Sequence, residues 1–185
     1  MDKDEREKVS KVEDLWIDIG AVSRAEAAGR VRIGDPGVLA SQVLEFPNGR
    51  IVSRSIDNRI GSFVVLEALR LLSEGERPAA AVTAVATTRE EISSNGGGAR
   101  PLATHLEPAV AIVVDVTHAT DYPAMDKRRH GDYRLGGGPV LSRGASVNSA
   151  VFELLAETAE REGIAYTIEA ASRATSVPRA PIAMP

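Results

Sequence analysis

Cysteine is absent from the 185 residues, so the chain can form neither a disulfide bond nor a thiolate metal site. Any zinc ion would need carboxylate, imidazole or water ligands. Long apolar runs are also lacking, because no stretch approaches the roughly 20 residues of a membrane span. Met1 to Ser10 is mostly charged and lacks the apolar stretch of a signal peptide. We therefore expect a cytoplasmic protein without a membrane partner.

An excess of basic charge is missing as well. The 22 Lys and Arg residues face 26 Asp and Glu residues, which gives a net charge of −4. This balance provides no electrostatic footprint for a polyanion, so nucleic acid is not an expected partner. Aromatic residues are few, at 4%, but the apolar share of 43% is ordinary for a globular protein and predicts a hydrophobic core.

Helical spacing begins near Asn58 and ends at Gly75 and Pro78. The apolar positions of this predicted helix are Ile60, Phe63, Val64, Leu66, Leu69 and Leu72. A second amphipathic helix is predicted between Ala150 and Glu162, capped by Gly163. Three apolar runs read as strands: Ala80 to Thr87, which we expect to be buried, Val110 to Val114, and Ile164 to Ile168. The alternation of strands and helices predicts an α/β layer sheet.

The first 52 residues have a different pattern, rich in short strands and turns. Leu15 to Gly20 alternates as a strand, and Ser23 is a plausible N-cap of a short helix that ends at Gly29. Further strands are predicted at Val31 to Ile33, Val38 to Phe46 and Ile51 to Val52, with a tight turn at Pro47-Asn48-Gly49. So few strands cannot close into a barrel by themselves. The stretch from Ser172 to Pro185 builds no further element.

Acidic residues stand where the predicted strands and helices meet. Asp57 heads the long helix, Glu90 and Glu91 follow the strand that ends at Thr87, and Asp115 closes Val110 to Val114. Ligands of open α/β sheets collect at the carboxyl ends of strands, so neighbouring strands would bring these four carboxyl groups together. Such a cluster repels itself unless cations neutralise it. Two divalent metals about 3.5–4 Å apart would do so and would acidify a bridging water for a free Glu to deprotonate.

Each of these residues also has a structural interpretation. Asp57 alone is more often a helix N-cap that satisfies the amides of Asn58 to Ile60. Glu90-Glu91 alone is more often a solvated turn, and Asp115 alone an ordinary start of a loop. The glycine triplets at Gly96 and Gly136 lack phosphate-loop spacing, which favours turns or backbone beside a site. No G-x-S-x-G elbow of a serine hydrolase is present.

Taken together, the motifs resemble the dinuclear-metal aminopeptidases of the tetrahedral (TET) family, which include glutamyl and deblocking aminopeptidases. The resemblance rests on Asp57-Asn58-Arg59 opening a long apolar helix, Glu90-Glu91 after an apolar strand, and Val113-Val114-Asp115-Val116-Thr117-His118-Ala119. It extends upstream through Trp16 to Ala21 and Val31 to Asp35, and downstream through Leu135 to Val140.

The resemblance implies an α/β fold of the zinc-exopeptidase type, a three-layer sheet with helices on both faces. Residues 1–52 would be part of an inserted small β-barrel domain, and residues 53–185 part of the catalytic domain. Asp57 would bridge two zinc or cobalt ions, Glu91 and Asp115 would each ligate one, and Glu90 would be the general base. The implied activity is release of N-terminal residues from peptides. Relatives form a homo-oligomer, a hollow tetrahedral dodecamer.

The chain also departs from the family pattern. A His-x-Asp ligand motif lies upstream of the inserted domain in relatives, and a histidine follows the segment that Ser176 to Arg179 resembles; both are missing here, as if the chain were cut at both ends. His118 is the nearest substitute, whereas His105 and His130 look like surface or loop residues. The first alternative is therefore an inactive remnant that serves as a binding or structural module. A glycosidase is a weaker alternative, because adjacent glutamates make poor opposing carboxyls across a sugar.

Overall fold

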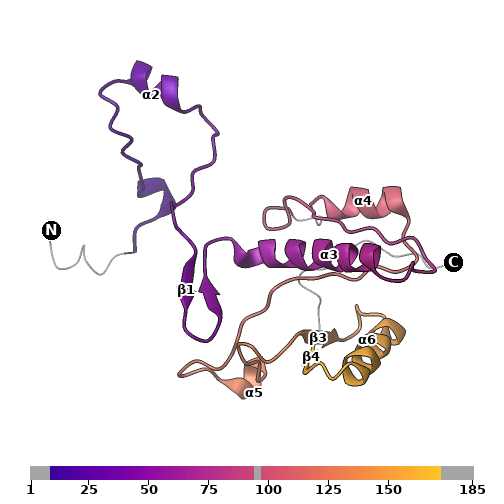
Figure 1. The fold of residues 1–185 in the computed structure, drawn as a ribbon. Helices are drawn as coiled ribbons and strands as arrows, with labels where there is room; N and C mark the ends of the chain where they lie inside the picture. Colours follow the sequence, from indigo (N-terminus) through magenta and orange to yellow (C-terminus); the bar gives the residue numbers. More distant parts are fainter. Residues whose placement is uncertain (1–8, 94–96, 172–185) are drawn as a thin grey trace. The chain divides into compact units, whose positions relative to one another are not determined.

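The computed structural model describes residues 9–93 and 97–171 (Figure 1). Contacts divide the chain into two compact units, Met1–Gln42 and Val43–Pro185, and we describe each by itself. The predicted domain boundary between residues 52 and 53 stays a prediction. The segment from Ser172 to Pro185, expected to build no element, lies outside the described residues, as do residues 94–96, which include the first glycine of the first triplet, and most of the charged start.

The first unit contains a short 3-10 helix, η1 (Val12–Asp14), and the helix α2 (Arg24–Arg30). The hydroxyl of Ser23 accepts a hydrogen bond from the Glu26 amide at 3.2 Å, and the Glu26 carboxylate accepts one from the Val22 amide at 3.0 Å. This reciprocal arrangement satisfies amides that have no partner within the helix. The prediction of a short helix capped by Ser23 is confirmed, although the helix ends one residue later than expected.

The strands predicted at Leu15 to Gly20 and Val31 to Ile33 are wrong, because residues 9–42 contain no strand. Aspartates close local turns there instead. The Asp18 carboxylate accepts from the Gly20 amide at 2.8 Å, and the Asp35 carboxylate accepts from the Arg32 amide at 2.8 Å. Such side-chain bonds compete with strand ladders for the same backbone groups.

A β-hairpin opens the second unit. Strand β1 (Leu44–Phe46) pairs antiparallel with β2 (Arg50–Val52), with Phe46 opposite Arg50. Asn48 and Gly49 have φ of 65° and 68°, the positive values that a tight primed turn requires. The predicted turn is confirmed. The strand predicted at Val38 to Phe46 is shorter than expected, because its hydrogen-bonded pairing begins only at Leu44.

Helix α3 (Ile56–Glu74) follows the hairpin and ends where the sequence predicts, with the amide of Gly75 bonded to the Leu71 carbonyl at 3.0 Å. Arg70 forms ion pairs with two glutamates of its own helix, Glu67 and Glu74. The apolar side of α3 stays largely open, with Phe63 59% and Leu66 54% exposed. The predicted helix is therefore confirmed, but it contributes little to the core.

The core lies in a βαβ unit near the end of the described chain (Figure 1). Strand β3 (Val140–Arg143) runs parallel to β4 (Thr167–Ala170), and α6 (Ser149–Arg161) connects them. The side chain of Asn148 caps α6 by accepting from the amides of Ala150 and Val151. Three residues on one face of α6 are buried: Phe152, Ala156 and Ala159. Helix α6 was predicted, strand β4 begins later than expected, and β3 was missed.

The runs Ala80 to Thr87 and Val110 to Val114 correct the sequence interpretation. Neither is part of a ladder within residues 9–93 and 97–171, and Val82 and Ile112 are 47% and 59% exposed. A strand needs hydrogen-bonding neighbours, and an apolar run specifies neither which strand it pairs with nor the register. In the structure these segments belong to neither a helix nor a strand.

Two short helices complete the description, α4 (Ala99–Leu106) and α5 (Lys127–His130). Between them Thr120, only 2% exposed, accepts a hydrogen bond from the Tyr133 amide at 2.8 Å and donates to the Gly131 carbonyl at 3.1 Å. These bonds tie the chain that follows Asp115 to the loop after α5. Among the described helices, none is long and apolar enough to cross a membrane.

Candidate metal centre

Asp57 lies at the irregular start of α3. Its backbone, with φ −77° and ψ 111°, and that of Asn58, with φ −118° and ψ 49°, are not helical, and the peptide bond between them is cis. Regular helix therefore begins after Asn58. The amide of Gly61 donates to the Asn58 side-chain oxygen at 2.9 Å, which makes Asn58 the capping residue. The alternative interpretation of Asp57 as the N-cap is wrong, because its neighbour has that role.

Asn58 also joins the helix to the segment that carries Asp115. Its side-chain nitrogen donates to the Val114 carbonyl at 2.9 Å, across 56 residues of sequence. Because Asp57 and Asp115 each adjoin one end of this bond, their backbones are held near each other. A side chain at Gly61 would collide with this arrangement, since its Cβ would lie 2.8 Å from the Asn58 Cγ.

Glu90 and Glu91 lie in a turn, in which the Ser93 amide donates to the Glu90 carbonyl at 3.3 Å. The described end of the glycine triplet packs against the residues just before this turn. The Gly98 amide donates to the Thr88 carbonyl at 2.8 Å, and a Cβ at Gly97 would lie 2.7 Å from the Arg89 carbonyl oxygen. Glycine thus allows the backbone to approach the Glu90 turn closely, in agreement with the expectation of a turn rather than a phosphate loop.

The four predicted acids meet in the electrostatic environment of Glu91. The charge of Asp57 is the largest cause that raises the pKa of the Glu91 carboxyl above its ordinary value. The charge of Glu90, partial desolvation, a hydrogen bond with the Asp57 side chain, and the charge of Asp115 raise that pKa further. Carboxylates from three separate segments therefore act on one side chain, all of them exposed to solvent.

The donor chemistry suits hard divalent cations or zinc, which bind carboxylate oxygens. As placed, no three His, Asp or Glu side chains in the described parts of the chain form a set that could hold a metal ion. His118, the candidate substitute ligand, is exposed and belongs to no such set of described residues, and the same holds for His105 and His130. The carboxylates fit a cation by type and by mutual repulsion, and side-chain rotation would be needed to gather them around one.

The sequence interpretation missed the structural role of Asn58 at the start of α3. The sequence contained a signal for the capping role, because Asn is among the strongest N-capping residues and Asn58 directly precedes the regular part of α3. The second role of Asn58, its bond to Val114, had no local signal at all, because it depends on two segments meeting in space.

Comparisons with known proteins show which family the chain resembles. A family model described as M42 glutamyl aminopeptidase matches residues 1–180. A lysyl aminopeptidase of Pyrococcus furiosus is 32% identical over 164 residues, which cover 88% of this chain and 45% of that protein. The chain therefore spans about half the length of the curated relatives it matches.

Two solved structures are similar over nearly the whole chain. An aminopeptidase of the archaeon Desulfurococcus kamchatkensis matches with a TM-score of 0.82 and 32% identity, over 94% of this chain and 49% of that one. A TET aminopeptidase of a marine sediment thaumarchaeote matches with a TM-score of 0.78 and 31% identity, over 95% of this chain and 51% of that one. These matches confirm the α/β, zinc-exopeptidase-like fold class and the predicted family resemblance.

Proposed function

Because this chain belongs to the M42 glutamyl aminopeptidase family, we propose that it supplies the carboxylates of a two-metal centre that releases N-terminal residues from peptides. One observation carries the proposal. The pKa of Glu91 is raised by Asp57 and Asp115, which are distant in sequence, as well as by its neighbour Glu90. Mutual repulsion of this kind is relieved when cations bind.

In the proposed centre Asp57, Glu91 and Asp115 would hold two divalent ions, with Asp57 shared between them, Glu91 on one and Asp115 on the other. Zinc or cobalt would supply Lewis acidity and a water that ionises near neutral pH. The free carboxylate of Glu90 would accept a proton from the attacking water and pass it to the departing amine. Adjacent residues in an extended or turning segment point to different sides, so Glu91 can bind metal while Glu90 handles the proton.

The asparagine that caps α3 would orient this centre without contacting a metal. Its bond to Val114 sets the distance between the backbone of Asp57 and that of Asp115. Two-metal chemistry depends on such spacing, because one group must bridge ions that lie about 3.5–4 Å apart. We therefore assign Asn58 a positioning role.

The resemblance to TET aminopeptidases, whose members form dodecamers, further suggests a cytoplasmic homo-oligomer that acts on peptides. The acidic balance of the chain supports a peptide rather than a nucleic acid as the partner. Sedimentation of the purified chain would test self-association directly. A strictly monomeric chain at all concentrations would contradict this part of the proposal.

Titration with Co²⁺, followed by visible absorption and calorimetry, tests the centre. We expect two ions per chain, and at least about 100-fold weaker binding in Asp57→Asn, since even changes beyond the direct ligands cost 10–100-fold. Glu91→Gln and Asp115→Asn should each weaken one of the two ions. Glu76→Gln is the matched control, because it removes an exposed carboxylate outside the cluster. Equal binding by all four variants would refute the proposed ligands.

Hydrolysis of leucyl-anilide and of short peptides separates the enzyme from the alternative. We expect turnover that needs metal and that falls by about 10²–10⁴-fold in Glu90→Gln, while metal affinity is retained. Metal binding with no turnover in the unaltered chain would instead favour a binding or structural module. That outcome would leave the ligand assignment intact and overturn the peptidase activity of this chain.

A further inference from the structure

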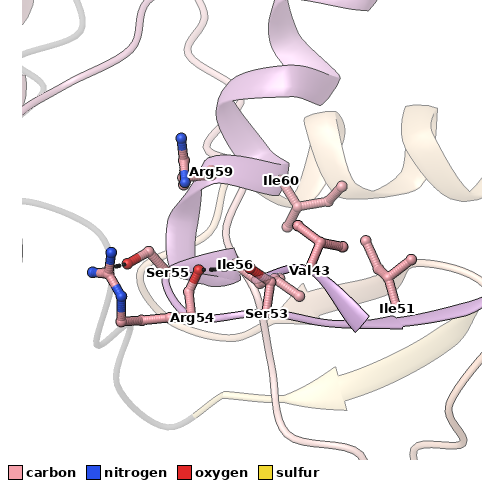
Figure 2. Close-up of a pocket in the computed structure, with 8 residues that line it drawn as sticks. All are labelled: Val43, Ile51, Ser53, Arg54, Ser55, Ile56, Arg59 and Ile60. Carbon is pink, nitrogen blue, oxygen red and sulfur yellow. Dashed lines mark hydrogen bonds between the residues drawn. The ribbon is translucent and has the colours of Figure 1, made fainter. Parts of the chain in front are cut away.

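A small, open hollow in the surface, called the cavity below, is lined by residues of the β1–β2 hairpin region and of the start of α3. Its volume is about 190 Å³. Aliphatic side chains form one part of the wall, and serines and arginines form the rest; the lining is Val43, Ile51, Ser53, Arg54, Ser55, Ile56, Arg59 and Ile60. Figure 2 shows Val43, Ile51 and Ile60 gathered on one side, with Arg54 and Arg59 on the other.

The two arginines of this cavity have no acidic partner among the described residues. Arg54 donates only to the Ser55 hydroxyl, at 3.1 Å, and Arg59 has no ion pair or side-chain hydrogen bond within residues 9–93 and 97–171. Other arginines, Arg50 among them, also lack an acidic partner among the described residues; Arg54 and Arg59 differ in that both line one cavity. In an acidic chain, two unneutralised guanidinium groups beside one cavity provide a local site for an anion.

We propose that this cavity binds the C-terminal residue of a short peptide, with an apolar side chain against the aliphatic wall and the free carboxylate beside Arg54 and Arg59. Guanidinium groups match carboxylates through paired N–H donors. The volume of about 190 Å³ is below the roughly 300–1,000 Å³ of pockets for drug-sized ligands, which suits a single residue.

The proposal deepens the proposed function, since it rests on a peptide substrate and names the class as short peptides with an apolar last residue. The arginines of the cavity would attract the C-terminal carboxylate of such a peptide, and the rest of the peptide would extend toward the proposed metal centre. Ser55, Ile56 and Arg59 are within two residues of Asp57, so the cavity and the proposed centre adjoin along the chain. A charged anchor for one end of the peptide would favour one direction of binding.

Binding to the metal-free chain tests the proposal separately from the metal centre. The probes are N-acetyl-leucine, N-acetyl-leucinamide and N-acetylglycine, in EDTA, followed by amide chemical shifts in ¹⁵N-labelled protein. None of the three has a free amine. We expect saturable shifts confined to residues 43–60 with N-acetyl-leucine, and at least about fivefold weaker binding of the other two, one lacking the charge and the other the side chain.

Variants then assign the charge. Arg54→Gln and Arg59→Gln should each reduce the affinity for N-acetyl-leucine about fivefold, and should leave the affinity for N-acetyl-leucinamide unchanged. Arg50→Gln is the matched control, because Arg50 lies on β2, is exposed and does not line the cavity. Both cavity arginines are exposed, so their replacement should leave the fold intact.

Three results would overturn the proposal: equal binding of acid and amide by the unaltered chain, shifts outside residues 43–60, or equal losses in Arg50→Gln. The first two use the unaltered protein, so they hold even where a variant misfolds. Failure of cobalt binding would refute the metal centre and leave the peptide-binding cavity standing. If cobalt binds but N-acetyl-leucine binds no better than its amide, the peptide-binding cavity is refuted and the metal centre stands.

Discussion

Replacing Asn58 by alanine tests the link between α3 and the Asp115 segment. The change removes two hydrogen bonds together, the cap on the Gly61 amide and the bond to the Val114 carbonyl, each 2.9 Å long. Both bonds are partly buried, so water replaces them incompletely. We expect the first turn of α3 to open more often and the backbone of Asp57 to move away from that of Asp115.

The magnitude follows from the two bonds. Loss of an Asn cap costs about 1 kcal/mol, and loss of a typical hydrogen bond costs about another 1 kcal/mol. Their sum, about 2 kcal/mol, corresponds to roughly 30-fold faster hydrogen exchange in the first turn of α3. Asn58→Ser keeps an oxygen that can cap the helix but loses the donor to Val114, so we expect about half of that loss.

Native-state hydrogen exchange at the Gly61 amide is the direct assay, with the later turns of α3 as an internal reference. Cobalt affinity is the second readout, because a displaced Asp57 should weaken both ions in the alanine variant. Exchange at Gly61 within threefold of the unaltered chain would refute the capping role. Equal exchange in the serine and alanine variants would show that the bond to Val114, rather than the cap, controls opening.

Three further predictions concern the rest of the second unit. Phe152→Ala should lower the free energy of unfolding of the βαβ unit by about 3–5 kcal/mol, because Phe152 is only 3% exposed; urea denaturation measures it. Gly138→Ala should weaken the β3–β4 pairing, because φ at Gly138 is 89° and a Cβ there would collide with the Ala165 carbonyl; exchange of the β4 amides reports this. Lys127→Met should raise the pKa of Asp132, which the hydrogen bond from Lys127 holds below its ordinary value; carboxyl NMR titration follows it. Since the pKa of Asp132 is lowered by folding, its stabilising effect is present at neutral pH and is lost as pH falls through the folded pKa.

Each of these has a control and a contrary outcome. Leu154→Ala, on the exposed side of α6, should cost far less than Phe152→Ala; equal costs would contradict the assigned core. Gly136 also has a positive φ, but nothing surrounds it closely. Gly136→Ala therefore introduces backbone strain without a collision, which separates the two effects that Gly138→Ala combines. An unchanged Asp132 pKa in Lys127→Met would show that the ion pair is not populated in solution.

Local features of this chain were predictable from its sequence. The turn at Asn48-Gly49 follows from two residues that tolerate positive φ, and the end of α3 at Gly75 follows from the loss of helical spacing. Helix α2 was found through Ser23, whose hydroxyl reaches an amide three residues away. All of these signals act over a few residues, within the range that composition and spacing describe.

Strand pairing was not predictable in the same way. Val140 to Arg143 is a short stretch after three glycines, and it becomes a strand because β4, 27 residues later, offers a parallel partner. The more strongly apolar run Val110 to Val114 has no ladder in the described chain. Apolar character indicates that a segment can be a strand, but hydrogen bonds to a neighbour make it one.

For the candidate metal centre, too, some features follow from the sequence and others only from the tertiary structure. The sequence alone determined which acids were present, their order, and the family whose motifs they match, because these depend only on residue type and spacing. Tertiary structure decided that Asn58 rather than Asp57 caps α3, and that the charges of Asp57, Glu90 and Asp115 all act on Glu91. Electrostatic repulsion and hydrogen bonding depend on distance through space, which the order of residues does not specify.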